Sequence, residues 1–335
     1  MSDDTLPTVS AVIPARNAAG HIGDAMRSVL AQDYPAELEL IVATGTEDDG
    51  TRQEAMRVAD GDRRVRVIEN QSGRTPVGLN AAIALAKGQV IVRCDAQAVL
   101  PPDYLATAVR VLVDTGADVV GGVQAARGHT FMERAVAIAM TTPIGTGGPR
   151  FRVGGRPGPT DTVYLGVFRR AALERVGLYD EAMTRNQDYE LNHRVRASGG
   201  VVYFHPDLAV AYTPRATLLS LWRQYFAYGE WKRRLLRRHP EALRARQLVP
   251  PLFVIALIAS AVTALTPWRL AALVVPALYA ASLAATVLLE LVRRRDPAAL
   301  AMPLAAVTMH VAWGIGFLGA DGAAPEPQIP PLPAR

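Results

Sequence analysis

The chain has 335 residues, enough for one large domain or two smaller ones, and half of them are hydrophobic. Its single cysteine, Cys94, excludes an internal disulfide framework and a zinc site built from cysteines. The net charge of +5 is carried almost wholly by arginine, a bias that points to genome composition more than to function, and we expect no nucleic-acid partner.

Apolar runs and segments of helical periodicity alternate over the first 95 residues. We expect strands at residues 8–15, 38–44, 64–70 and 89–95, and helices at residues 21–32, 51–61 and 75–88. Continuous apolar strands separated by helices predict a parallel sheet that is covered on both faces. Ligands of such sheets bind beyond the carboxyl ends of the strands. The segments that follow those ends begin at Asn17, Thr44, Asn70 and Asp95.

The C-terminal part of the chain holds three apolar segments, at residues 248–266, 270–289 and 297–320. Each is close to the roughly 20 residues that a helix needs to cross a bilayer. We therefore predict three transmembrane helices. A buried helical hairpin in a soluble protein is the alternative, but three successive segments are too much apolar surface for a small domain to hide.

Charge placement predicts how these helices are oriented. Arginines cluster before the first segment and between the second and third, whereas the loop between the first two has only Arg269. Because positively charged loops stay cytoplasmic, we expect a multi-pass protein of the cell (inner) membrane with a cytoplasmic N-terminal part. The Pro-rich tail, residues 321–335, is then expected outside and disordered. The N-terminus has no basic stretch leading into an apolar core, so we expect no signal peptide.

Residues 218–238 mix aromatic side chains with arginines directly before the first apolar segment. This pattern favours a helix in the headgroup region over an ordinary solvated helix. The predicted organisation is thus a globular domain followed by interfacial helices, membrane helices and a tail, with boundaries at residues 1–215, 216–247, 248–320 and 321–335.

Six short stretches, in order, carry a resemblance to a known family. They read "VIPARN", "GRTPVGLNAAI", "RCDAQA", "DTVYLGVFRR", "RNQDYELNHRVRASGG" and "RQYFAYGEWK". They resemble the family-two glycosyltransferases of GT-A fold, most closely the membrane-anchored exopolysaccharide glucosyltransferases of the succinoglycan type. The resemblance implies an α/β fold, the GT-A nucleotide-diphospho-sugar transferase fold with its Rossmann-like mixed sheet, followed by transmembrane helices. GxGxxG after the first strand and GxxxxGK[ST] are both absent, so dinucleotide and P-loop folds have little support.

The resemblance implies transfer of a sugar from a nucleoside diphosphate to an acceptor hydroxyl. Charge developing on the diphosphate calls for a divalent cation, and the hydroxyl calls for a base. Asp95 is the expected ligand of Mg²⁺ or Mn²⁺, with Gln97, in place of a second acid, helping weakly or contacting the donor. The alternative for Asp95 is a strand-end turn cap. Asp188 is the expected catalytic base, and one base without a covalent nucleophile implies inversion.

The same resemblance assigns the remaining donor-site and acceptor-site residues. The family usually has paired aspartates after the second strand, whereas this chain has Ala43 and Thr44 there and acids only later, which leaves the nucleobase open. Glu190 is expected either at the acceptor or paired with an arginine. The other expected donor-site residues are Pro14, Ala15, Arg16, Asn17, Thr44, Asp48, Arg74, Asn80 and Ala96. The other expected acceptor-site residues are Tyr164, Leu165, Gly166, Gln187, Arg223, Gln224 and Trp231.

Four functions remain open from the sequence. The favoured one adds a sugar, from a UDP-hexose as the resemblance implies, to a polyprenyl-diphosphate-linked saccharide in exopolysaccharide or cell-envelope glycan synthesis. A processive synthase is less well supported, because three spans are few for a channel and Gln224 and Trp231 fit its QxxRW pattern poorly. Transfer to polyprenyl phosphate itself and a catalytically inactive membrane scaffold are the other two.

Overall fold

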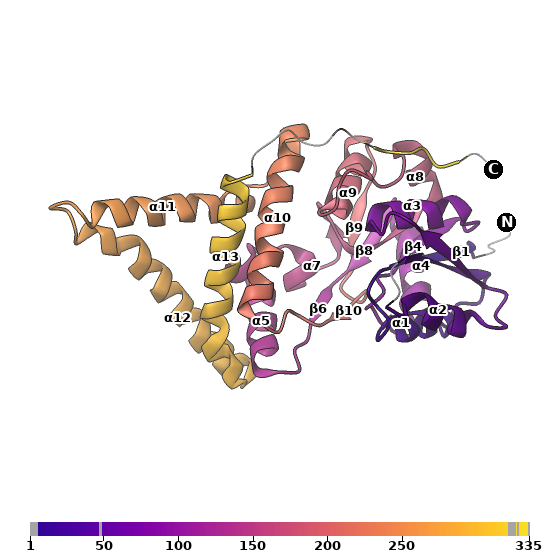
Figure 1. Ribbon diagram of the computed structural model, residues 1–335, viewed down its shortest axis with the longest axis horizontal. Coiled ribbons are helices and arrows are strands. Elements are labelled where there is room, and N and C mark those ends of the chain that lie inside the picture. The colour runs from indigo at the N-terminus through magenta and orange to yellow at the C-terminus, as the bar shows by residue number, and fades with distance from the viewer. Residues whose placement is uncertain (1–5, 47–48, 321–325, 327, 334–335) are drawn as a thin grey trace. The chain divides into compact units, whose positions relative to one another are not determined.

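The computed structural model describes residues 6–46, 49–320, 326 and 328–333. The chain forms two compact units (Figure 1). The first, called here the sheet unit, comprises Met1–Ala125, Gly154–Tyr212 and Glu326–Arg335. The second, called the helical unit, comprises Ala126–Val153 and Thr213–Pro325.

The sheet unit is built on an eight-stranded sheet of order β3-β2-β1-β4-β8-β5-β9-β7. Its strands are β1 (Val9–Ala15), β2 (Leu38–Gly45), β3 (Val65–Asn70), β4 (Val90–Arg93), β5 (Val119–Gly122), β7 (Gly158–Pro159), β8 (Tyr164–Arg169) and β9 (Val202–Phe204). Strands β1 to β4 are parallel, and β8 joins β4 in the antiparallel sense, so the sheet is mixed, as the resemblance implied. Two further short strands, β6 (Gln124–Ala126) and β10 (Val210–Tyr212), pair with each other.

Helices cover both faces of this sheet because the strands are apolar on both sides. Successive strand residues point to opposite faces, and accordingly Val12 lies in one core cluster and Ile13 in the other. Helix residues Met26 and Leu105 belong to the cluster of Ile13, and Leu79 belongs to the cluster of Val12. The helices of the sheet unit are α1 (Ile22–Leu30), α2 (Thr51–Ala59), α3 (Thr75–Leu85), α4 (Tyr104–Thr115), α8 (Arg170–Val176) and α9 (Gln187–Ala197). The predicted strands and helices of the first 95 residues are therefore confirmed.

The helical unit contains the predicted apolar and interfacial segments. Its helices are α5 (Phe131–Thr141), α6 (Pro143–Thr146), α7 (Arg150–Val153), α10 (Leu218–Arg238), α11 (Val249–Thr263), α12 (Val274–Arg294) and α13 (Met302–Leu318), with short 3₁₀ turns η1 (Pro240–Ala242), η2 (Ala245–Gln247), η3 (Ala271–Leu273) and η4 (Pro297–Ala301). Three helical stretches are long and apolar enough to cross a membrane: Ala245–Thr263, Ala271–Arg294 and Pro297–Leu318. The length and apolar character of the predicted spans are confirmed.

The third apolar stretch differs from the first two in how much of it is covered by protein. Half of its most apolar window is buried, against 11% and 17% for the other two. Much of the cover comes from α10. The two helices pack so closely that a Cβ on Gly229 would lie 2.0 Å from the carbonyl oxygen of Trp313, and a Cβ on Gly316 would lie 2.1 Å from that of Phe226. Glycine at both positions lets the two backbones meet.

The two compact units divide the chain differently from the predicted boundary at residue 215. Residues 126–153 group with the C-terminal helices, where Arg294 donates to the Thr141 hydroxyl at 2.9 Å and Arg134 pairs with Asp296 at 3.1 Å. Local sequence patterns do not reveal such pairings because the partners lie about 150 residues apart in the chain.

The described part of the Pro-rich tail is ordered within the sheet unit, contrary to the expectation of a disordered tail. The amide of Gln328 donates to Asp180 Oδ1 at 2.8 Å, and its carbonyl accepts from the amide of Glu181 at 2.8 Å. The amide of Leu178 donates to the Pro330 carbonyl at 3.0 Å. Proline lacks an N–H but keeps its carbonyl acceptor, so an extended Pro-rich strip can still accept such bonds.

Candidate active site

The carboxyl ends of β1 to β4 lie along one edge of the sheet, and the expected donor residues follow them. Asp95 comes two residues after β4, in a turn closed by the amide of Ala98 donating to the Asp95 carbonyl at 2.9 Å. The Asp95 side chain is 37% exposed, and Gln97 on the same turn is exposed, whereas Ala96 is buried. A carboxylate and an amide oxygen are thus presented on one accessible turn, which suits a hard divalent cation.

Asp188 is the second residue of α9 and lies in its first turn; the N-cap residue is Asn186, which has a φ of 59°. Its side chain is 40% exposed, whereas Glu190, two residues further on, is fully buried. Residues two apart on a helix point to different faces, so one acid can reach a ligand while the other enters the core. A carboxylate in the first turn is also favoured by the helix dipole.

Arg93 links the two acids, and sequence reasoning missed this residue. It is the last residue of β4 and only 6% exposed. Its Nε lies 3.0 Å and its Nη2 2.9 Å from Asp95 Oδ1, and its Nη1 donates to Asp188 Oδ1. The available signal was an arginine ending an otherwise apolar buried strand, since a buried cation requires an anionic partner.

The charges of this trio shift one another. Burial raises the pKa of Asp188 above its usual value, while the Arg93 cation opposes that shift and Asp95 adds to it. Desolvation acts against the charged form of Arg93, but the two carboxylates hold its pKa well above the usual value. Arg93 is therefore a permanent cation between the two acids.

Tyr164 comes to the same edge because β8 runs antiparallel to β4. β8 begins at Tyr164 and runs antiparallel to β4, so its first residue lies toward the edge at which β4 ends. Burial raises the pKa of the Tyr164 hydroxyl well above its usual value, and the negative charge of Asp95 adds to the shift. The half-buried Tyr164 therefore lies beside the predicted metal ligand.

The other two residues expected to form the acceptor-side wall are part of the core. Leu165 is 2% exposed, has a φ of 47°, and accepts a bond from the Tyr104 hydroxyl at 3.2 Å through its carbonyl. A Cβ on Gly166 would lie 2.7 Å from the Phe168 ring. These residues shape the backbone at the edge rather than present side chains to a ligand.

The expected nucleotide end of the site follows β1 and β2. Arg16 and Asn17 are both exposed, and Asn17 has a φ of 50°. Arg16 passes the two glycines at the ends of β2 and β3, 3.6 Å from a Cβ on Gly45 and 3.5 Å from one on Gly73. Pro14 and Ala15 are partly or fully buried below them. An exposed arginine and asparagine at strand ends can meet a nucleotide.

Thr44, near the end of β2, and the acids that follow this strand have different surroundings. Thr44 is fully buried, and its hydroxyl donates to the Ile68 carbonyl at 3.2 Å, so it is used within the sheet. Asp49 accepts from the Thr51 hydroxyl at 2.7 Å just before α2, and this bond lowers the pKa of Asp49. Asp48, the expected last acid of this stretch, lies outside the described residues.

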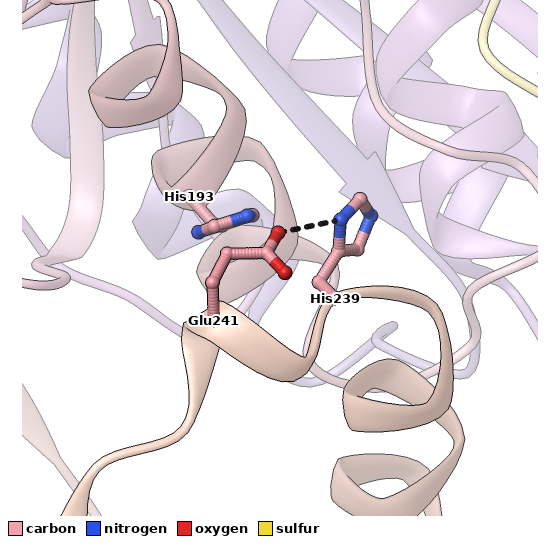
Figure 2. A group of neighbouring side chains, drawn as sticks. All are labelled: His193, His239 and Glu241. Atoms are coloured by element: carbon pink, nitrogen blue, oxygen red, sulfur yellow. Dashed lines mark ion pairs between the residues drawn. The ribbon is translucent and has the colours of Figure 1, made fainter.

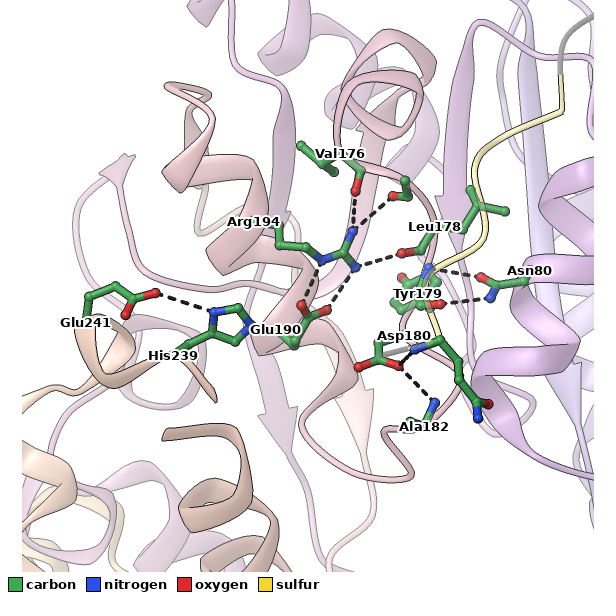
Figure 3. Close-up of polar contacts among 12 residues, drawn as sticks. Asn80, Val176, Leu178, Tyr179, Asp180, Ala182, Glu190, Arg194, His239 and Glu241 are labelled. Carbon is green, nitrogen blue, oxygen red and sulfur yellow. Dashed lines mark hydrogen bonds and ion pairs between the residues drawn. The ribbon is translucent and has the colours of Figure 1, made fainter. Parts of the chain in front are cut away.

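Two side chains expected at the donor brace the loop that precedes Asp188. Asn80 is buried on α3 and exchanges two bonds with the backbone of Tyr179, donating to its carbonyl at 2.9 Å and accepting from its amide at 3.0 Å (Figure 3). Arg74 donates to the carbonyl of Glu181 at 3.0 Å. Both residues position the loop from the side of α3.

Glu190 is also a brace, in agreement with the alternative of an arginine partner. It binds Arg194 one turn along α9 through both carboxylate oxygens, at 2.7 and 2.8 Å. Arg194 in turn donates to the carbonyls of Val176 and Leu178, at 2.5 and 2.7 Å (Figure 3). The neighbouring Gln187 is buried as well.

The remaining expected acceptor residues belong to α10 in the helical unit. Arg223 is exposed, Gln224 is buried and donates to the Tyr228 hydroxyl at 2.9 Å, and the ring of Trp231 lies 4.7 Å from the guanidinium carbon of Arg234. Just beyond this helix, His239 Nδ1 lies 3.4 Å from Glu241 Oε1 (Figure 2).

Comparisons with known proteins support a common origin for this arrangement. A family model described as Glycosyl transferase family 2 matches residues 10–177. The succinoglycan biosynthesis protein ExoA of Rhizobium meliloti (strain 1021) is 32% identical over 321 residues, which cover 95% of this chain and 96% of ExoA. A dolichyl N-acetyl-alpha-D-glucosaminyl phosphate 3-beta-D-2,3-diacetamido-2,3-dideoxy-beta-D-glucuronosyltransferase of Methanococcus voltae is 21% identical over 318 residues, which cover 92% of this chain and 95% of that protein.

One solved structure is similar along almost the whole chain. The mannosyltransferase PcManGT from Pyrobaculum calidifontis, in complex with GDP-Man and Mn²⁺, has a TM-score of 0.61 at 23% identity. The match covers 94% of this chain and 88% of PcManGT. A likeness at this level of identity shows a shared fold.

Proposed function

The chain belongs to glycosyltransferase family 2, and on that premise we propose that it is an inverting enzyme that moves a hexose from a nucleoside diphosphate to a lipid-linked saccharide. It is a glycosyltransferase with a GT-A-like sheet, related to a protein of succinoglycan synthesis. The observation that carries the finer proposal is the pairing of Asp95 and Asp188 through Arg93 at the carboxyl edge of the sheet. The donor is a UDP-hexose in this proposal, because the resemblance favours uridine.

Asp95 and Gln97 are the residues that would hold Mg²⁺ or Mn²⁺. When bound, the cation supplies charge neutralisation for the leaving diphosphate. Both Arg93 contacts on Asp95 fall on Oδ1, so Oδ2 is not used by the guanidinium. The Mn²⁺ and GDP-Man of the PcManGT structure are in keeping with a metal-dependent nucleotide-sugar site on this fold.

Asp188 is the proposed base. Its carboxylate accepts the proton of the acceptor hydroxyl while that oxygen bonds to the anomeric carbon and the bond from carbon to the phosphate oxygen breaks. An α-linked donor then gives a β-linked product, because attack comes from the opposite face. The 40% exposure of the side chain leaves it within reach of an acceptor, and the raised pKa makes it a stronger base than free aspartate.

The proposed acceptor is a saccharide on polyprenyl diphosphate, reached from the cytoplasmic face of the cell membrane. The aromatic and basic helix α10 and the apolar helices after it keep the enzyme at the bilayer where such a lipid resides. The name of the Methanococcus voltae relative, which describes transfer to a dolichyl-linked sugar phosphate, supports this acceptor class.

The test is a donor panel. Membranes containing the protein are incubated with labelled UDP- and GDP-sugars and native lipid extract, with Mn²⁺, with Mg²⁺ and with chelator. Metal-dependent label in the organic phase from one donor is the expected result, and lipid analysis distinguishes a lipid-linked saccharide from polyprenyl phosphate as acceptor. Label in an insoluble polymer would identify a processive synthase, and no transfer with acceptor lipid present would favour a scaffold.

A further inference from the structure

We propose that Arg93 is a positioning residue that holds the base Asp188 and the metal ligand Asp95 as one charge-paired unit and keeps divalent-cation affinity low until the donor binds. This inference rests on the proposed function, because it concerns how the same site operates. Its evidence is the geometry of three side chains in the sheet unit.

The shape of the guanidinium makes one residue able to serve both acids. Nε and Nη2 contact Asp95 while Nη1 contacts Asp188, so the planar fork sets the separation of the two carboxylates. The centre of the Tyr179 ring lies 5.8 Å from the guanidinium carbon, within the range of a cation–π interaction. A lysine at this place would offer a single charged point and could not span both partners in a fixed plane.

The charge balance of the trio then sets the attraction for a cation. Two carboxylates and one guanidinium leave a net charge of −1, and Gln97 adds none. A second cation placed next to Asp95 is repelled by Arg93, whose side chain is only 7% exposed and poorly screened by water. Diphosphate oxygens bring the missing negative charge, so the metal is expected to bind mainly together with the donor.

This arrangement predicts two effects of opposite sign for Arg93→Gln. Removing the guanidinium takes the net charge of the trio to −2, so Mn²⁺ in the absence of nucleotide should bind about tenfold more tightly. Transfer should fall by about a hundredfold, because Asp188 loses the partner that orients it. A residue with a purely structural role would weaken both properties together.

The experiment uses the full chain in nanodiscs. Mn²⁺ binding is measured by paramagnetic resonance without nucleotide, and kcat is measured with the donor found in the panel. Arg66→Gln, an exposed arginine on β3, is the matched control and should change neither property. Arg93→Lys keeps the charge, so its Mn²⁺ affinity should stay near the wild-type value while kcat falls.

Each outcome decides the proposal. Unchanged or weaker Mn²⁺ binding by folded Arg93→Gln, or a kcat within twofold of wild type, would overturn it. If Arg93→Gln fails to fold, Arg93→Lys decides, since wild-type kcat in that variant contradicts the need for a fork. If the wild-type protein transfers no sugar, the proposed function fails, and the Mn²⁺ titration still tests the charge pairing by itself.

A second inference comes from the C-terminal tail, independently of the active site. The hydrogen bonds of Gln328 and Pro330 place the tail with the sheet unit, so the chain after α13 is on the same side of a membrane as that unit. Only nine residues separate Leu318 from Gln328. Fully extended, they would reach about 32 Å, barely the hydrocarbon thickness, and with unpaired backbone groups in lipid. A return crossing after α13 is therefore excluded.

Arginines lie near both ends of α13, which indicates that both ends are on the same side of the membrane. Arg293 and Arg294 precede it at the end of α12. At its other end Arg233 of α10 donates to the carbonyls of Phe317 and Leu318, at 3.1 and 3.0 Å. Because arginine-rich ends stay cytoplasmic, both ends of α13 belong to the cytoplasmic face.

We infer that only α11 and α12 cross the membrane, as a hairpin, and that α13 lies with α10 at the cytoplasmic surface. The hairpin tip is apolar and open, with Leu265, Trp268 and Leu270 at 89%, 75% and 78% exposure, as expected of a segment that reaches the far interface. α13 is half-buried and packs closely against α10 through Gly229 and Gly316, which leaves it less lipid-facing surface than a spanning helix.

Topology mapping in a bacterial host tests this inference. A C-terminal fusion to green fluorescent protein should fluoresce, and one to alkaline phosphatase should be inactive. Thr266→Cys at the tip should react with an impermeant maleimide on intact spheroplasts, whereas Arg295→Cys should react only after permeabilisation. The wild-type chain is the background control, because its one cysteine, Cys94, is buried. An active phosphatase fusion would show three crossings and overturn the inference.

Discussion

Helix α9 carries two acids that pair with arginines, and the two acids differ in how exposed they are. The side chains of Glu190 and Arg194 are 0% and 13% exposed, and Arg194 also donates hydrogen bonds to backbone carbonyls. Asp188 is 40% exposed, while its partner Arg93 is 7% exposed and also holds Asp95. Two acids two positions apart, each paired with an arginine, thus form a buried brace in one case and, in the other, the accessible pair that we propose to be catalytic. Accessibility of the acid, rather than the presence of a salt bridge, separates the two roles.

The largest expected effect on activity comes from replacing the accessible acid, Asp188. Asp188→Asn should lower kcat by about 10³-fold, because the amide cannot accept the acceptor proton. Its melting temperature should stay within a few degrees of wild type, since the side chain is partly exposed. Asp114→Asn, an exposed aspartate on α4, is the control and should keep full activity. Equal activity in the two variants would remove Asp188 from the mechanism.

Substitution of the buried acid Glu190 should lower stability rather than activity. Glu190→Gln leaves Arg194 buried without its counter-charge and should destabilise the fold by about 3 kcal/mol. This loss is measured as a shift in the denaturation midpoint, while the folded fraction retains a near-normal kcat. A large loss of kcat at unchanged stability would assign Glu190 to the acceptor instead of the brace.

The pH dependence should separate the two acids further. Asp188 must be ionised to act, and burial raises its pKa while Arg93 partly opposes the shift. Transfer should therefore fall, as pH decreases, at a value above the pKa of about 3.9 of free aspartate. Arg93→Gln should move this acidic limb of kcat to higher pH, and Arg66→Gln should leave it in place. If the acidic limb of the kcat profile stays at the same pH in Arg93→Gln, the limb reports the ionisation of a group other than Asp188.

The smallest effect is expected from replacing Gln97, the exposed amide on the same turn as Asp95. Gln97→Ala removes one neutral ligand and should weaken Mn²⁺ affinity with donor present by only a few-fold, because Asp95 and the diphosphate supply the charged oxygens. Isothermal titration with a non-hydrolysable donor analogue measures this change. A loss as large as that of Asp95→Ala would make Gln97 an equal partner in the site.

Much of the site was predictable, although several residues proved to have another use. Asp95 falls at the expected edge because strand order in a parallel sheet determines where strand ends lie. Asp188 and Tyr164 were expected at the site only from the resemblance; Asp188 is joined to Asp95 through Arg93, and Tyr164 begins the antiparallel β8. Thr44 and Asn80 were expected at the donor site, and Glu190 either at the acceptor or paired with an arginine; the polar atoms of all three bind the protein itself. A sequence shows which side chains can form hydrogen bonds, and only the packing shows which partners they take.

The local chemistry of this chain was determined by its sequence. Apolar periodicity set the strands, the helices and the lengths of the apolar segments, because side-chain burial follows the repeat of the backbone. The tertiary structure decided the contacts between residues far apart in the chain. It brought Arg93 between two acids 93 residues apart and placed Gln328 beside Asp180, because these pairings depend on how whole elements pack.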